Sequence, residues 1–257
     1  MLFKKTLKRF FPFLFSSGTY QAFGVEDAPN KYPVDRARYL NMAAYLHEEY
    51  QRRGKPIRVL DIGCSEGMML LYCNKNNTPV QFYGIDILEE RKQKALARGY
   101  QDVFIKDIRN CDFSKCTEPF DAVICSHILE HLEDPGEFLE RLKAAMLPEA
   151  LLIVGVPIGL LPGILWRRYI SPIYKARHRK EASLKRFGHV SFFTLPALRR
   201  LLQQRGFYPE IICGDYFIRA RGFFLENYKW WFDFNQWYGR LFPGILGTVT
   251  LKARLHS

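Results

Sequence analysis

The stretch VLDIGCSEGMML, residues 59–70, joins a short apolar run to an acidic residue and two glycines. The run resembles a buried strand, and Asp61, Gly63 and Gly67 follow it at once. Glycines permit a tight turn and a close approach of the backbone to a ligand. Unpaired N–H groups at the start of a helix attract anionic groups. The order therefore predicts a strand, a ligand-binding turn and a helix that begins near Glu66.

Strand-like and helix-like segments alternate on both sides of this turn. The predicted strands span residues 57–62, 81–87, 102–107, 120–126, 150–156, 208–217 and 247–255. The predicted helices span residues 35–53, 66–74, 89–98, 134–146 and 194–206. This alternation predicts a doubly wound α/β fold with a mostly parallel seven-stranded sheet and an antiparallel edge strand.

A nucleotide-type ligand is expected at the carboxyl ends of the strands of such a sheet. No Gly-Lys-Ser/Thr follows the turn, so it is not a Walker A loop. The dinucleotide fingerprint also fails, because Ser65 stands at its second glycine position. Three acids, Asp61, Asp86 and Asp107, end three successive predicted strands. They predict a ligand site lined by carboxylates at this edge.

Six motifs in the expected order give the chain a specific resemblance. They are VLDIGCSEG, YGIDI, KDI, FDAVICSHILEHLEDP, LLIVGVP and GHVSFFTLPALRRLLQQRGF, between about residues 57 and 213. The chain resembles the class I S-adenosylmethionine-dependent methyltransferases, in the branch with ubiquinone-biosynthesis-type small-molecule enzymes. The resemblance implies a Rossmann-like methyltransferase fold and S-adenosylmethionine as cofactor. Ser65 departs from the pattern, in which glycine is commoner.

The resemblance also assigns roles to residues of the predicted edge. The glycine turn would meet the methionine part of the cofactor, Asp86 the ribose hydroxyls, and Ser126 the region near the sulfonium. Asp107 and Ile108 would meet the adenine. The implied cofactor-binding set is Asp61, Gly63, Ser65, Gly67, Asp86, Ile87, Asp107, Ile108 and Ser126.

Three histidines are candidate catalytic residues. An oxygen or acidic carbon nucleophile must lose a proton, and histidine suits that task near neutral pH. His127 follows the fourth predicted strand, where the acceptor is expected, and His131 lies one helical turn further on. His189 lies in FGHVSFF, a stretch that borders the active site in many relatives. A purely structural role stays open for His131 and His189.

The formal net charge of +12 is concentrated in two segments. Residues 1–25 hold four Lys and Arg and no acid, and residues 161–222 hold thirteen against three acids. This pattern favours an anionic partner such as lipid headgroups, phosphate or nucleic acid, or else a solvated surface. The start of the chain is an amphipathic basic segment, which predicts a membrane-interface helix, a docking helix or a mitochondrial presequence.

The chain is predicted to comprise a basic amphipathic arm, residues 1–34, and a methyltransferase domain, residues 35–257. Two insertions stand out within the domain: a basic and apolar segment, 158–188, and an aromatic segment, 218–246. They predict a lid or platform at a membrane interface, and the late aromatics equally fit a hydrophobic core. The six cysteines form no CxxC pair, which favours reduced thiols and no metal site.

The leading functional hypothesis is methylation, with O-methylation favoured, of a small-molecule, lipid-linked or glycan acceptor. The alternatives are an RNA methyltransferase and a non-catalytic cofactor-binding partner protein. The absence of Asn/Asp-Pro-Pro-Tyr/Phe and Pro-Cys motifs disfavours methylation of bases in nucleic acid. The expected location is the cytoplasm, including peripheral attachment to a membrane, with mitochondrial import as a minor alternative.

Overall fold

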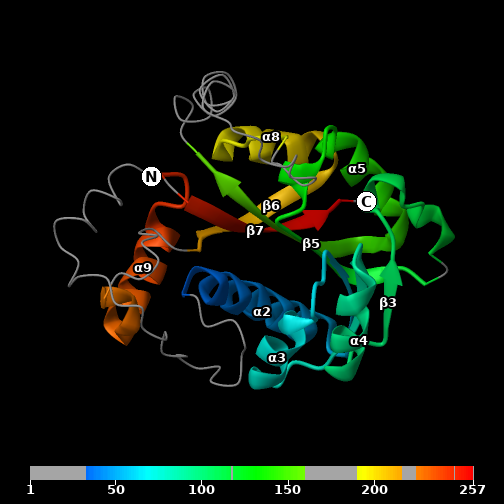
Figure 1. Cartoon of the computed structure of the whole chain (residues 1–257). Coiled ribbons are helices and arrows are strands. Elements are labelled where there is room, and N and C mark those ends of the chain that lie inside the picture. Colours follow the sequence, from blue (N-terminus) through cyan, green and yellow to red (C-terminus); the bar gives the residue numbers. More distant parts are fainter. Residues whose placement is uncertain (1–32, 117, 160–189, 216–223, 246, 257) are drawn as a thin grey trace, which may run out of the picture.

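Seven strands form one mixed sheet in the order β3-β2-β1-β4-β5-β7-β6 (Figure 1). The computed structural model describes residues 33–116, 118–159, 190–215, 224–245 and 247–256. The strands are β1 Ile57–Ile62, β2 Val80–Asp86, β3 Asp102–Ile105, β4 Phe120–Ser126, β5 Met146–Ile158, β6 Phe207–Gly214 and β7 Gly247–Leu255. The chain therefore has the predicted seven-stranded, mostly parallel sheet.

Antiparallel pairing occurs at one side of the sheet, as predicted. Strands β3, β2, β1, β4 and β5 pair in parallel. Strand β7 lies between β5 and the edge strand β6 and runs antiparallel to both. Strands β5 and β6 thus point the same way, and their carboxyl ends share one edge with those of β1, β2 and β4.

Helices cover both faces of the sheet (Figure 1). One face carries α2 Pro33–Arg53, α3 Met68–Lys75 and α4 Glu89–Ala97, and the other carries α5 Pro135–Leu142 and α8 Leu195–Gln204. Side chains alternate along β1, so that Val59 packs under α2 and α3 whereas Leu60 faces the α5 side. Two buried apolar clusters result, one on each face.

Local capping sets several helix boundaries at the predicted residues. Asp134 Oδ1 accepts the Glu137 N–H at 2.8 Å at the start of α5, and Thr194 Oγ1 accepts the Ala197 N–H at 3.2 Å at the start of α8. The prediction for α3 was wrong by two residues: the helix begins at Met68, not at Glu66. The turn extends through Gly67, whose φ of 73° is left-handed.

An aromatic-rich helix, α9 Lys229–Leu241, follows the short 3-10 turn η7 Phe224–Asn227. It packs against the carboxyl end of β6, where the backbones of Gly214 and Gly239 meet. A Cβ added at Gly239 would overlap the Gly214 carbonyl oxygen, and a Cβ added at Gly214 would lie 2.8 Å from the Gly239 oxygen. Only glycine at both positions permits this approach.

Gly239→Ala is therefore expected to lower the free energy of unfolding by about 1–3 kcal/mol, although alanine normally favours a helix. The added methyl group meets backbone, which cannot move aside as a side chain can. Gly136→Ala is the matched control, because its Cβ would meet side-chain atoms and not backbone: the Arg205 guanidinium at 2.8 Å and Asp134 Oδ1 at 3.2 Å. Urea denaturation of both variants tests this. Equal stabilities would contradict the close contact.

Among the described residues, no helix is both long and apolar enough to cross a membrane. All six cysteines are free thiols, and four of them are buried. Residues 1–32 of the predicted arm, residues 160–188 of the first insertion, and residues 218–223 and 246 of the second lie outside the described ranges. The predicted domain boundaries remain predictions.

Candidate functional site

The turn after β1 adopts a left-handed backbone at three positions. Gly63, Ser65 and Gly67 have φ of 75°, 50° and 73°. The Gly63 N–H donates to the Ile85 carbonyl at 2.7 Å, which ties the turn to the neighbouring strand β2. Ser65 carries a side chain in a conformation that favours glycine, and such strain is concentrated at functional sites.

Gly84, inside β2, lets the turn lie close to the sheet. A Cβ at this position would be 2.5 Å from the Cys64 Sγ and 3.2 Å from the Val103 side chain. The buried Cys64 therefore fills the space that a larger residue would take. The packing of Cys64 on Gly84 brings the turn against the carboxyl end of β2.

Asp61 is a buried carboxylate at the base of the turn. It is 7 % exposed, and its Oδ2 accepts a hydrogen bond from the Tyr100 hydroxyl at 2.7 Å. Burial raises the pKa of Asp61 to about 6, and the charge of Asp86 adds to the rise. The Tyr100 hydrogen bond and the charge of Arg38 act against it. The site thus holds an acid that a nearby cation would stabilise in its ionised form.

Asp86, at the end of β2, fixes the turn from the other side. Its Oδ2 accepts the Ser65 N–H at 2.9 Å, and its Oδ1 accepts the Leu88 N–H at 3.0 Å. The Arg91 guanidinium lies 3.5 Å from Oδ2. Asp86 is 5 % exposed, so the carboxylate is desolvated and held by backbone donors.

The predicted adenine residues, Asp107 and Ile108, follow β3, and Ile87 of the predicted cofactor set follows β2. Ile87 is largely exposed for an apolar side chain, and Ile108 is half-buried at the start of the 3-10 turn η2 Ile108–Asn110. Asp107 caps this turn and also accepts the Arg109 Nε at 2.9 Å. This side-chain hydrogen bond lowers the pKa of Asp107. A planar apolar group would find two isoleucines and a carboxylate at this end of the edge.

Ser126, at the end of β4, contributes a buried hydroxyl oxygen without a hydrogen-bond partner in the described part of the chain. A Cβ on Gly155 of β5 would lie 2.9 Å from this oxygen. Buried polar atoms are normally paired. The orphaned Oγ therefore fits a ligand that supplies the missing partner.

His127 follows Ser126 with a φ of 59°, and its N–H donates to the Gly155 carbonyl at 2.7 Å. Its Nδ1 lies 2.9 Å from the Glu130 Oε1. Glu130 is 1 % exposed, whereas the His127 ring is 30 % exposed. In the tautomer in which Nδ1–H donates to the Glu130 Oε1, the Nε2 lone pair is available as a base.

The other two histidines are placed differently. His131 ends the 3-10 turn η4 Leu129–His131 and is half-buried. His189 lies outside the described residues, and the chain is described again from Val190, whose N–H donates to the Glu130 carbonyl at 2.8 Å. The structure thus joins the predicted set from Asp61 to Ser126, together with His127, along one edge.

Sequence motifs missed the partners that hold these groups. Tyr100, which binds Asp61, follows α4 and belongs to no predicted motif. Arg38 and Tyr39 come from α2, and the charges of Arg38 and Asp61 influence one another. Gly155 lies in the motif LLIVGVP, but the motif gives no sign that its carbonyl accepts the His127 N–H. Local spacing carries no signal for such partners, because folding alone brings them together.

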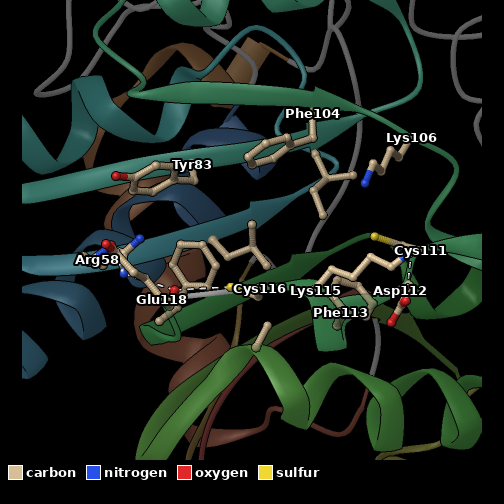
Figure 2. A pocket seen from close by; sticks show the side chains of 14 residues that line it. Arg58, Tyr83, Phe104, Lys106, Cys111, Asp112, Phe113, Lys115, Cys116 and Glu118 are labelled. Atoms are coloured by element: carbon tan, nitrogen blue, oxygen red, sulfur yellow. Dashed lines mark hydrogen bonds and ion pairs between the residues drawn. The ribbon is translucent and has the colours of Figure 1, made fainter.

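A cavity of about 430 Å³ opens on the α5 face of the sheet and contains none of the predicted cofactor residues (Figure 2). The connection from β3 to β4, which holds the 3-10 turns Ile108–Asn110 and Phe113–Lys115, supplies part of its wall. Tyr83 and Phe104 point into it from neighbouring strands (Figure 2). Arg58, on its wall, pairs with Glu118 at 2.9 Å and lies over the Tyr83 ring. The candidate cofactor site is therefore separate from this cavity.

The sheet order, the glycine turn and the acids at the strand ends define a Rossmann-like methyltransferase class of protein. A family model described as "Methyltransferase domain" matches residues 34–210. The chain belongs to this methyltransferase domain family.

Relatives and solved structures agree with this assignment. A ubiquinone biosynthesis O-methyltransferase of Haemophilus ducreyi is 32 % identical over 105 residues, which are 38 % of this chain and 44 % of that protein. An uncharacterized Synechococcus protein is 27 % identical over 173 residues, covering 65 % of this chain and 41 % of that protein. The matches thus span less than half the length of these curated relatives.

Among solved structures, the plantazolicin methyltransferase BpumL in complex with SAH is similar in fold. The TM-score is 0.54 at 18 % identity, over 88 % of this chain and 86 % of that one. The N-methyltransferase NodS from Bradyrhizobium japonicum gives a TM-score of 0.54 at 14 % identity, over 88 % and 98 %. At such identities the likeness concerns the fold.

Proposed function

We propose that the chain is an S-adenosylmethionine-dependent methyltransferase that acts on a small-molecule acceptor. The observation that carries the proposal is the pair of buried carboxylates, Asp61 and Asp86, on the two sides of a left-handed glycine turn. Buried carboxylates suit a ligand with a positive charge and hydroxyl groups, because a hydrogen bond to an ionised group is stronger than one between two neutral groups.

The residues at the edge fit the proposed cofactor part by part. Asp61 and the glycine turn suit its amino acid portion, and Asp86 suits the two ribose hydroxyls. Ile87 and Ile108 offer apolar contact for the adenine, and Ser126 offers an unpaired oxygen near the centre of the edge. When bound, S-adenosylmethionine supplies a methyl group on a sulfonium.

His127 is proposed as the general base. The Glu130 carboxylate holds the Nδ1 proton, so Nε2 can take a proton from an acceptor hydroxyl. The backbone bond to Gly155 fixes the position of His127 beside Ser126. This arrangement favours O-methylation. His131 and His189 stay secondary candidates, and His189 lies outside the described residues.

The acceptor is proposed to be lipid-linked, prenylated or an anionic glycan, with the reaction at a membrane surface. Support comes from the cationic segments 1–25 and 161–222 and from the aromatic helix α9. Methylation of RNA is the alternative that the same cationic charge allows.

Cofactor affinity is expected to fall as the pH drops below about 6, the pKa to which burial raises Asp61. Above this pH the carboxylate is ionised and attracts a cation. Below this pH the Asp61 carboxyl must first lose its proton, so the affinity for the cofactor falls by up to about tenfold per pH unit. Calorimetric titrations from pH 5 to pH 8 test this. Asp61→Asn should flatten the curve, and an equally steep fall in that variant would assign the effect to another group.

The test of the proposed function is a calorimetric titration of the purified full chain with S-adenosylmethionine and S-adenosylhomocysteine. Saturable one-to-one binding of both is expected. NAD and ATP serve as control ligands, because other doubly wound folds bind them. Binding of NAD or ATP in preference to S-adenosylmethionine and S-adenosylhomocysteine would overturn the proposal.

A further inference from the structure

One stripe of α9 carries large apolar side chains that face solvent. Trp230, Phe234, Trp237 and Leu241 recur at helical spacing, and the two tryptophans are 57 % and 56 % exposed. The opposite side of the helix is buried through Phe232, Asn235 and Gly239. The more apolar side of α9 is thus the side that does not pack on the sheet. We call the exposed stripe, together with Tyr228 and Phe242, the aromatic face of α9.

The rings of the aromatic face form a continuous surface. Trp231 stacks on Phe234 with ring centroids 5.7 Å apart, and Phe234 lies 6.0 Å from Trp237. Contiguous exposed apolar surface marks an interaction site. Tryptophan and tyrosine in particular favour the interface between water and a lipid bilayer, where one end of the ring system is apolar and the other is hydrated.

The aromatic face lies at the edge of the sheet that carries the candidate cofactor site. α9 packs on Gly214 at the carboxyl end of β6, and Gln236 Nε2 donates to the Asp215 carbonyl at 3.3 Å. The Arg36 guanidinium of α2 lies 5.3 Å from the centre of the Phe232 ring. Figure 1 shows α9 beside the start of α2, beyond the ends of β6 and β7.

The cationic segments of the sequence join the described structure at this same edge. Residues 1–25, with four cations and no acid, precede α2, which begins at Pro33. The cation-rich range 161–222 includes the connections that leave after Gly159, at the end of β5, and after Asp215, at the end of β6. Cation-rich segments of the sequence are therefore joined covalently to the edge that carries the exposed aromatic face. An anionic bilayer attracts both.

We propose that the aromatic face of α9 docks this edge of the sheet on an anionic lipid bilayer. The helix lies in the plane of the interface, with its aromatic face among the lipids and Gly239 against the sheet. The adjacent basic segments add electrostatic attraction to anionic headgroups. Docking in this orientation turns the candidate active site toward acceptors held in the membrane. That last step rests on the proposed function, whereas the docking does not.

Vesicle sedimentation of the full-length protein tests the docking. Vesicles of phosphatidylcholine with phosphatidylglycerol are the probe, and pure phosphatidylcholine vesicles show the dependence on anionic lipid. Trp230→Gln combined with Trp237→Gln is expected to weaken partitioning by about tenfold or more, because two interfacial anchors are lost. Both side chains are exposed, so the fold should persist, and circular dichroism checks this.

Tyr208→Gln is the matched control. Tyr208 is 52 % exposed, as the tryptophans are, but it lies at the amino end of β6, away from the proposed docking edge. Its substitution should leave vesicle binding unchanged. Equal loss in the control and in the double variant would mean that the aromatic face has no special role.

Three results would overturn the proposal: no vesicle binding by the wild-type chain, unchanged binding by the double variant, or a dimer that the double variant abolishes. The last would identify a second copy of the chain as the occupant of the face. If the double variant loses retention of RNA but still binds vesicles, nucleic acid would be the partner of the aromatic face instead. Cofactor titration is independent of all these outcomes. Vesicle binding without cofactor binding would therefore refute only the proposed function.

Discussion

Asp86→Ala is expected to weaken the binding of S-adenosylmethionine by about 100- to 1,000-fold. The carboxylate is 5 % exposed and ends β2, where the two ribose hydroxyls are proposed to bind. Two hydrogen bonds to a charged acceptor contribute about 3–4 kcal/mol together, and 1.4 kcal/mol corresponds to about tenfold. Calorimetric titration measures the change directly.

Asp86→Ala also removes the acceptor for the Ser65 and Leu88 N–H groups, so the glycine turn loses one of its ties. Glu90→Ala controls for the loss of negative charge, because Glu90 is exposed on the neighbouring α4. This control should bind the cofactor within about twofold of wild type. Near-normal affinity in Asp86→Ala would place the ribose elsewhere and remove the main support for the site.

His127→Ala is expected to slow methyl transfer by about 100- to 10,000-fold, the range that a positioned general base contributes. Cofactor affinity should stay nearly unchanged, because the His127 side chain contacts Glu130 and is proposed to face the acceptor. Initial rates with the identified acceptor, combined with cofactor titration, separate the two effects. A loss of cofactor affinity that matches the loss of rate would contradict a role in proton transfer.

His131→Ala tests which of the two candidate histidines in the described ranges, His127 or His131, acts as the general base. His131 is half-buried in η4, whereas Glu130 orients the His127 ring at 2.9 Å. The larger loss of rate is therefore expected in His127→Ala. A larger loss in His131→Ala, with its fold intact by circular dichroism, would transfer the general-base role to His131.

Much of the fold was predictable because its signals are local. Strands such as β1, β4 and β5 contain short apolar runs, and the Asp134 and Thr194 side chains cap helices by accepting backbone N–H groups three residues away. The glycine turn was predictable in the same way. The start of α3 was missed because Gly67 continues the turn. The sequence alone does not show whether Glu66 belongs to the turn or to the helix.

The rest of the site depends on contacts between distant segments. Tyr100 binds Asp61 across 39 positions in the sequence, and the His127 N–H donates to the Gly155 carbonyl of another strand. In α9 the large apolar side chains of one stripe face solvent, whereas the buried side holds Phe232, Asn235 and Gly239. Burial, not residue type, separates the two sides, and burial is known only once the chain is folded.

The most direct measurement for the account is a labelling assay. The purified protein is incubated with methyl-labelled S-adenosylmethionine and a cell lysate that retains its membranes, with Asp86→Ala as the blank. The lipid, small-molecule, RNA and protein fractions are then counted. The account predicts label in the lipid or small-molecule fraction with wild type only. Label confined to RNA, or no label in any fraction although the cofactor binds, would contradict it.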